Sequence, residues 1–234
     1  MNEWILTPDR FLSREELGKL LKRAEELRSL GVAKRRKQPV RDWLVIRLAL
    51  LSGLRASEVA GLKVTDCFIG YSRSEILVTK GKGGRRRVVR IGKDLKGDLR
   101  WFLKWKAENG ELHPDAYLLR SQRSERLTRG AVWRRWKRHC PTHRLHDARH
   151  SHATLLLEAS KDLRLVQRQL GHSRPTTTAV YAGVFDERMT DAVNSMEQLA
   201  RASMKGRKPV TTDAPAAETD LATTDSTSPV PQAA

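Results

Sequence analysis

Apolar residues recur at helical spacing through most of this chain, and one short stretch breaks the pattern. From Leu17 to Leu27 the apolar residues repeat every three or four positions, and the run from Arg41 to Leu51 is apolar almost throughout. Such periodicity predicts amphipathic or buried α-helices. A chain with this pattern folds mainly by packing helices on one another, so any β-sheet is a small insertion.

Local signals predict where the helices begin and end. Ser13 followed by Glu16 is a capping-box pattern, which predicts the start of a helix that ends before Gly31. The basic residues 34–37 are expected to form a loop, and Gly53 is expected to stop the helix over 41–51. Further helices are predicted over residues 57–62, 95–106, 129–139, 147–159, 162–170 and 186–204.

The exception lies between residues 75 and 91. Two runs rich in β-branched residues, 75–79 and 87–91, flank the glycine-rich stretch 81–84, which predicts a β-hairpin. The predicted fold class is therefore mainly α with a small antiparallel β-sheet, an α+β domain. We expect this domain to span residues 1–208. Residues 209–234 are rich in Thr, Ala and Pro and are expected to be a disordered tail.

Positive charge is concentrated in the part that is predicted to fold. The 234 residues carry a formal net charge of +18, and the tail after residue 208 contributes −4, which leaves +22 on residues 1–208. A body this basic favours a polyanionic partner, above all nucleic acid. Two cysteines are too few for a disulfide framework, and no apolar run is long enough for a membrane span. We therefore expect a cytoplasmic protein, associated with the nucleoid when bound to DNA, and no membrane partner.

Four short segments and a tyrosine follow one another in an order that is typical of one enzyme family. They are Leu-Ser-Gly-Leu-Arg-Ala-Ser-Glu at 51–58, Gly-Lys-Gly at 81–83, His-Asp-Ala-Arg-His at 146–150, Leu-Gly-His at 170–172, and Tyr181. Together they resemble the tyrosine recombinase, or phage integrase, family from about residue 12 to residue 184. The resemblance implies the catalytic-domain fold of these DNA breaking and rejoining enzymes, and the activity of a site-specific recombinase.

The residue types fit the cleavage of a DNA phosphodiester. This reaction needs an in-line nucleophile, neutralisation of charge on the non-bridging oxygens, and an acid for the leaving oxygen. The resemblance implies that Tyr181 forms a 3′-phosphotyrosyl bond and that Arg55 and Arg149 hold the phosphate. Guanidinium groups suit that role because their planar fork stays charged. The covalent intermediate keeps the bond energy, so no ATP is expected. Because arginines supply the positive charge, no metal and no other cofactor is expected either.

The remaining residues that the resemblance assigns move protons or position the arginines. His146 and His172 would donate hydrogen bonds or relay protons, and Lys82 would protonate the leaving 5′-oxygen. Lys80 would share the strand face of Lys82, so it stays an alternative acid. Glu58, three residues after Arg55, would orient that arginine.

Basic clusters are expected to hold the backbone of double-stranded DNA without reading its sequence. The expected DNA-binding residues are Arg85, Arg86, Arg87, Arg134, Arg135, Lys137 and Arg138. The resemblance also implies a homotetramer on two synapsed DNA sites, with a DNA-bending helper protein as a further candidate partner. The helix expected over 186–204 either packs on its own core or docks on a neighbouring protomer.

Three alternatives stay open. Type IB topoisomerases nick and reseal one duplex with similar residues, and an accessory DNA-binding protein could keep the scaffold without the chemistry. The stretch with His139, Cys140, His143 and His146 could also be read as a zinc site, although it has no Cys-x-x-Cys pair.

The sequence departs from the family pattern in three places. The resemblance begins near the first residue, so we expect a single catalytic domain without the preceding DNA-clamping domain, similar in layout to fimbrial-switch invertases. Such a domain would hold DNA from one side, with weak and salt-sensitive binding. Pro175 replaces a branched aliphatic residue and Ala148 replaces a leucine. Neither change touches an expected catalytic group, so activity should survive.

Overall fold

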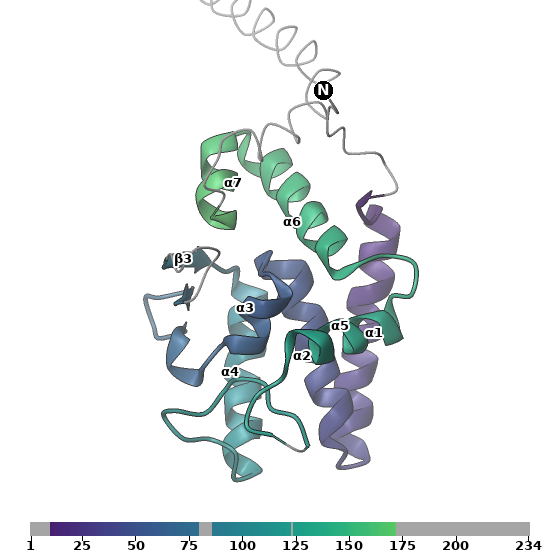
Figure 1. Ribbon diagram of the computed structural model, residues 1–234, viewed down its shortest axis with the longest axis vertical. Helices are drawn as coiled ribbons and strands as arrows, with labels where there is room; N and C mark the ends of the chain where they lie inside the picture. Colours follow the sequence, from purple (N-terminus) through teal and green to yellow (C-terminus); the bar gives the residue numbers. More distant parts are fainter. Residues whose placement is uncertain (1–9, 80–85, 123, 172–234) are drawn as a thin grey trace, which may run out of the picture. The chain divides into compact units, whose positions relative to one another are not determined.

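The computed structural model of the protein describes residues 10–79, 86–122 and 124–171, all of which belong to a compact unit that spans Met1–Glu187. A second unit, Arg188–Ala234, lies outside the described residues. Helices predominate, and three short strands form a small sheet (Figure 1). In chain order the elements are α1 (Arg14–Ala33), α2 (Lys37–Ser52), α3 (Ala56–Gly61), the 3₁₀ turn η2 (Val64–Asp66), β1 (Cys67–Phe68), β2 (Glu75–Val78), β3 (Arg87–Arg90), α4 (Lys93–Glu108), α5 (Arg129–His139), α6 (Leu145–Ser160) and α7 (Leu163–Leu170).

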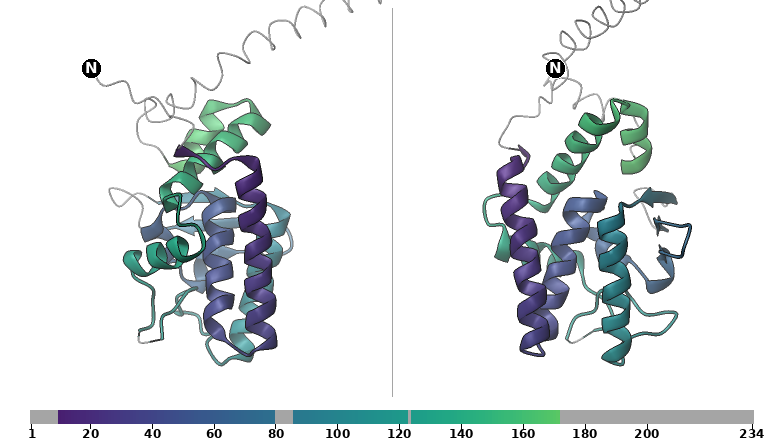
Figure 2. Two further views of the ribbon diagram at one scale, coloured as in Figure 1. Left: turned by 90° about the vertical axis from the view of Figure 1, so that its right-hand side faces the viewer. Right: turned by 180° about the vertical axis from the view of Figure 1, so that it is seen from behind.

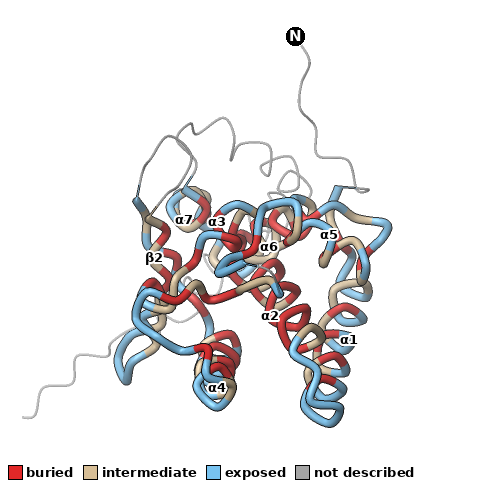
Figure 3. The backbone as a smooth tube through the Cα atoms, turned by 60° about the horizontal axis from the view of Figure 1, so that its bottom comes forward, coloured by how far each residue is buried: buried red, intermediate tan, exposed pale blue. Residues whose placement is uncertain are grey.

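Helix α2 is the centre of the main hydrophobic core. Eleven of its 16 residues are buried, because α1, α4, α5 and α6 all pack against it (Figure 2). Figure 3 shows the consequence, since α2 is buried along much of its length while the other helices present one buried face. The fully buried ring of Trp43 meets the ring of Trp101 from α4 edge-on, with 5.2 Å between centroids. The continuous apolar run of the sequence therefore marks a helix that is surrounded by others.

The predicted capping box at the start of α1 is present. The Ser13 hydroxyl accepts the backbone N–H of Glu16 at 3.2 Å, and the Glu16 carboxylate accepts the backbone N–H of Ser13 at 2.8 Å. The predicted end of the helix at Gly31 is wrong, because α1 continues to Ala33. Gly31 lies where α1 meets α2, and a Cβ atom there would be 2.6 Å from Val40 Cγ2. This glycine permits close helix packing instead of ending the helix.

The expected basic loop is shorter than predicted, because Lys37 already begins α2, four residues before the predicted start. The two predicted strands pair antiparallel, with Glu75 opposite Arg90 and Val78 opposite Arg87. A third strand, β1, adds to β2 and was not predicted; its two residues are too few to produce a periodic pattern. Ile76, Val78 and Val89 are buried, so one face of the sheet joins the core.

A separate small apolar cluster joins α6 to α7. It consists of Ala153 and Leu157 from α6 with Val166 and Leu170 from α7, all 2% exposed or less. This cluster holds α7 so that its last residue lies near the end of α2, as the site contacts below show. In the part of the chain that the structure describes, no helix combines the length and apolarity that crossing a membrane requires.

Candidate active site

Two helices end at left-handed glycines on either side of one buried arginine. Gly53 caps α2 with φ of 63°, and Gly171 caps α7 with φ of 66°. Arg149 of α6 is 2% exposed, and its guanidinium donates to the carbonyl of Gly53 at 2.5 Å and to that of Leu170 at 2.6 Å. Helix C-termini carry partial negative charge, which favours a cation. The side chain of Arg149 is thus fixed by main-chain atoms of two elements.

A second arginine begins helix α3, directly after this region. Arg55 is the N-cap residue of α3, and its backbone N–H donates to Glu58 Oε2 at 2.8 Å. The Arg55 guanidinium donates to Glu58 Oε1 at 3.0 Å, while a quarter of its side chain, 25%, remains exposed. The contact that we expected between Glu58 and Arg55 is therefore present. Glu58 itself is 1% exposed in its side chain, so this carboxylate is enclosed by its partners.

Arg87, an expected DNA-binding residue, is paired inside the fold. Its guanidinium forms a bidentate pair with Glu58, at 2.6 Å to Oε1 and 2.8 Å to Oε2, and only 12% of the side chain is exposed. This buried carboxylate from another element engages the Arg87 guanidinium, so a contact of Arg87 with DNA stays a prediction. The preceding residue, Arg86, is exposed and remains a candidate for DNA contact.

Glu58 stays ionised in this environment. Burial works to raise the pKa of its carboxyl, but hydrogen bonds from Arg87 and from the Arg55 backbone outweigh burial. With the charges of Arg87 and Arg149 they lower the pKa of Glu58 to about 2. Because Arg149 contributes to this shift while Arg55 binds Glu58 directly, the charges of Arg55 and Arg149 both act on the Glu58 carboxylate. A permanent carboxylate can hold the Arg55 guanidinium in one orientation at neutral pH.

Histidines of α6 border the two arginines. The rings of His146 and His150 meet edge-on with 4.5 Å between centroids. The pKa of His146 lies below its ordinary value, mainly because burial removes water from around the ring. The positive charges of Arg149 and Arg55 lower it further, and the negative charge of Asp147 opposes the shift. Burial and the neighbouring His146 and Arg149 lower the pKa of His150 to about 4. Both rings are neutral at pH 7, so His146 can donate or accept a proton.

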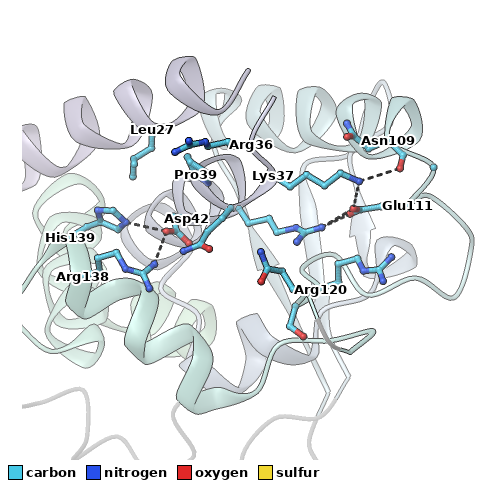
Figure 4. A pocket seen from close by; sticks show the side chains of 15 residues that line it. Leu27, Arg36, Lys37, Pro39, Asp42, Asn109, Glu111, Arg120, Arg138 and His139 are labelled. Carbon is cyan, nitrogen blue, oxygen red and sulfur yellow. Dashed lines mark hydrogen bonds and ion pairs between the residues drawn. The ribbon is translucent and has the colours of Figure 1, made fainter. Parts of the chain in front are cut away.

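The basic residues of α5 divide into two groups. Arg135 and Arg138 both pair with the buried carboxylate of Asp42 in α2, and Figure 4 shows the contact of Arg138. Only 12% of the Arg135 side chain is exposed, and its pair with Asp42 ties α5 to α2, so a contact of Arg135 with DNA stays a prediction. Arg138 remains 51% exposed and Arg134 is exposed as well, whereas Lys137 is partly covered. Arg134, Lys137 and Arg138 therefore stay candidates for phosphate contact.

The structure separates the residues of the alternative zinc site. His139 Nε2 lies 3.2 Å from Asp42 Oδ2, while His143 Nε2 lies 3.0 Å from Glu16 Oε1. Cys140 is buried, and burial raises the pKa of its thiol. Within the described residues no three His, Cys, Asp or Glu side chains gather as metal ligands would. The two histidines instead serve different carboxylates on different helices.

Several expected residues lie outside the described ranges. They are Lys80, Lys82, Arg85, His172, Pro175 and Tyr181, together with the helix expected over 186–204 and the tail over 209–234. Described elements flank two of them, since β3 begins soon after Lys82 and α7 ends just before His172. Their roles, and the boundaries of the predicted domain, stay predictions.

The described site unites Arg55, Arg149, His146 and Glu58 within a mainly α domain with a small antiparallel sheet, which is the fold of tyrosine recombinase catalytic domains. The sequence matches the model of the Phage integrase family over residues 10–188. The chain belongs to this family.

Individual relatives agree with this assignment. The chain is 37% identical over 183 residues to tyrosine recombinase XerA of Thermococcus kodakarensis, covering 75% of this chain and 62% of that protein. It is 34% identical over 161 residues to tyrosine recombinase XerA of Pyrococcus horikoshii, covering 66% and 54%. Among solved structures, the pre-cleavage complex of the XerH site-specific recombinase bound to difH substrate is similar with a TM-score of 0.63 at 27% identity, over 79% of this chain and 53% of that one. The matches thus span about half to three-fifths of these relatives.

Proposed function

We propose that this chain is a tyrosine site-specific recombinase, which cleaves and rejoins DNA strands through a 3′-phosphotyrosyl intermediate. The observation that carries the proposal is the pair Arg55 and Arg149, each anchored by protein atoms around the buried carboxylate of Glu58. Membership of the Phage integrase family and the names of the relatives support the same activity.

The two arginines would stabilise charge on the scissile phosphate. Arg149 is held by the carbonyls of Gly53 and Leu170, and Arg55 is held by Glu58. Donors that are already in place need no rearrangement when charge develops in the transition state, and this preorganisation is a large part of electrostatic catalysis. Because guanidinium groups supply the positive charge, the proposal assigns no metal or other cofactor, and because the covalent intermediate would conserve the bond energy, the step would need no ATP.

In the cleavage step the phenol oxygen of Tyr181 bonds to phosphorus, and the bond from phosphorus to the 5′-oxygen breaks. The phenol proton passes to a neighbouring base, for which neutral His146 is suited and His172 is a second candidate. Lys82, or alternatively Lys80, gives a proton to the leaving 5′-oxygen. Attack by a 5′-hydroxyl from another strand reverses each of these steps and releases the tyrosine.

Double-stranded DNA is the proposed partner. The exposed cations Arg86, Arg134 and Arg138 are available to its backbone, and a related recombinase has been solved in complex with a DNA substrate. Strand exchange between two sites would involve a homotetramer, with a DNA-bending helper protein as a candidate addition. Binding to duplex DNA would place the protein at the nucleoid.

A nicked suicide substrate tests the proposal directly. Duplexes from inverted repeats near the coding region would carry a nick next to the scissile phosphate, so that a short fragment diffuses away and cleavage cannot reverse. We expect the wild-type chain to form a covalent protein–DNA complex on a denaturing gel, and Tyr181→Phe to form none. Equal trapping of Tyr181→Phe would refute the nucleophile assignment.

A plasmid assay separates recombination from topoisomerase activity. A recombinase rearranges only plasmids that carry its sites, whereas a type IB topoisomerase relaxes any supercoiled plasmid. Relaxation of plasmids without sites would overturn the proposal. Binding to the sites with no covalent complex from the wild-type chain would point to an accessory DNA-binding protein instead.

A further inference from the structure

Gln169, in the last turn of α7, makes three hydrogen bonds to strand β3. Its side-chain amide donates to the backbone carbonyl of Arg90 at 2.7 Å and accepts the backbone N–H of Arg90 at 3.0 Å. Its own backbone carbonyl accepts a weaker bond from Arg87 Nε at 3.4 Å. No catalytic role that we derived uses Gln169, and its sequence context gave no signal for these contacts.

These bonds occupy the outer edge of the sheet. The strand order is β1-β2-β3, so among the described residues β3 has a neighbouring strand on one side only. An edge strand leaves backbone donors and acceptors unpaired on its other side. The backbone N–H and C=O of Arg90 both bind the side-chain amide of Gln169. This amide offers an oxygen acceptor and an N–H donor, the same two groups that a neighbouring strand would offer. Gln169 therefore fastens α7 to β3 along the strand edge.

Strand β3 also carries Arg87. Arg87 and Val89 lie on the same face of the strand, because side chains alternate, and Val89 is fully buried. On this face the Arg87 guanidinium reaches both oxygens of Glu58, and Glu58 in turn holds Arg55. Arg87 also packs against Gly171, where an added Cβ atom would lie 2.9 Å from Arg87 Nε. A shift of β3 away from α7 would thus loosen the contacts that orient Arg55.

We propose that Gln169 is a positioning residue of the active site: by clamping Arg90 of β3 to α7, it keeps Arg87 seated on Glu58 and so keeps the Arg55 guanidinium directed at the phosphate. This inference rests on the proposed recombinase function. It gives a role to a residue whose side chain binds the backbone of β3.

The variant Gln169→Leu removes both side-chain bonds while keeping a side chain of similar size. The measurement is the first-order rate of covalent complex formation on the nicked suicide substrate at saturating DNA. We expect about a fivefold to tenfold slower rate than wild type, since two neutral hydrogen bonds are lost. The matched control is Arg90→Ala, which removes the exposed ion pair of Arg90 with Glu75 but keeps both backbone groups. This control should cleave within about twofold of wild type.

A methylphosphonate at the scissile position separates a positioning role from a general loss of structure. This linkage replaces one charged non-bridging oxygen by a methyl group, so the reaction depends less on a well-placed guanidinium. We expect the deficit of Gln169→Leu to shrink to less than half on this substrate. Equal rates for Gln169→Leu and wild type on the natural linkage would overturn the inference, as would an equal deficit on both substrates. A deficit of Arg90→Ala as large as that of Gln169→Leu would overturn it too. Failure of the wild-type chain to form any covalent complex would instead refute the proposed function.

Discussion

His152 shows how closely single residues are fitted around the anchored arginine. Its ring packs on Gly53, where a Cβ atom would lie 2.6 Å from His152 Cδ2, so glycine is required there for space as well as for its positive φ. His152 Nδ1 lies 3.2 Å from the Leu50 carbonyl, whereas Nε2 is buried and has no partner among the described residues. Burial, reinforced by the charge of Arg149, lowers the pKa of His152 to about 4 although the Leu50 carbonyl opposes the shift.

This low pKa predicts that acid destabilises the fold in a defined window. The ordinary pKa is 6.5 and the folded value is about 4, so between these values the unfolded chain binds a proton that the folded chain does not. The free energy of unfolding should therefore fall as the pH falls from 6.5 to 4, by about 1.4 kcal/mol per pH unit for each such histidine. Urea unfolding across this range measures the slope.

The variant His152→Asn keeps a donor for the Leu50 carbonyl but does not titrate. Its slope should be shallower than that of wild type by about 1.4 kcal/mol per pH unit, with His150 accounting for part of what remains. An unchanged slope in His152→Asn would show that His152 does not carry this pH dependence. Above pH 6.5 the two proteins should respond alike to pH.

Among contacts between single residues, the sequence predicts those between residues that are close together in the chain. Glu58 lies three residues from Arg55 on one helical turn, a spacing that suits the contact which the family resemblance implies. The pair Arg87–Glu58 joins residues 29 positions apart, and Arg135 reaches Asp42 over 93 positions. A basic cluster looks the same in sequence whether its side chains face solvent or a buried carboxylate. Only the packing of elements distinguishes the two cases.

At the scale of elements, a buried carboxylate ties the start of α2 to the turn after α4. Arg41 Nη2 donates to both carboxylate oxygens of Glu111, at 2.7 and 2.8 Å, and Lys37 Nζ donates to Oε1 at 2.9 Å. Lys106, 1% exposed, lies 4.0 Å from the same carboxylate. Lys37 and Glu111 line a pocket, drawn in Figure 4, whose volume is about 770 Å³. These charges are largely paired with one another, which points to a joint between elements.

The variant Glu111→Gln should destabilise this joint strongly. It leaves the buried Arg41 and Lys106 without a counter-charge, and removing one partner of a buried pair typically costs about 3 kcal/mol or more. Urea unfolding at pH 7 measures the change. The control Asp115→Asn removes an acid that pairs with Lys63 while 88% exposed, and it should leave the unfolding midpoint unchanged. Equal midpoints for Glu111→Gln and wild type would show that this cluster does not stabilise the fold.

Among the elements, those with strong local signals were predicted well. The capping box of α1 and the glycine end of α2 are local, and both are where the sequence placed them. Gly31 led to a wrong prediction of the end of α1, because this glycine is needed for close packing against Val40 of α2 and does not end the helix. Strand β1 was missed because it exists only by pairing with β2. Elements that depend on a distant neighbour leave no pattern of their own.

At the scale of the whole molecule, the net charge is +18, and the cations behind it fall into two groups according to what they contact. Some are committed inside the fold, as Arg149, Arg87 and Arg135 are through their carbonyl and carboxylate partners. Others, such as Arg134 and Arg86, are exposed. A high net charge therefore predicts binding to a polyanion, but it does not tell which residues contact it. Two adjacent arginines of α5 fall on opposite sides of this division and permit a direct test.

Arg134→Gln and Arg135→Gln should fail in different ways, although both remove one positive charge. Loss of an exposed phosphate contact should weaken binding to duplex DNA and lower the slope of log affinity against log salt by about one, with the melting temperature unchanged. Loss of Arg135 should lower the melting temperature, because the buried Asp42 loses a partner, and should leave the salt slope of the folded protein unchanged. Fluorescence anisotropy over a salt series and thermal unfolding measure the two quantities. If Arg135→Gln lowered the slope and Arg134→Gln did not, the assignment of exposed cations to DNA would be reversed, and the side chain paired with Asp42 would have to leave it on binding.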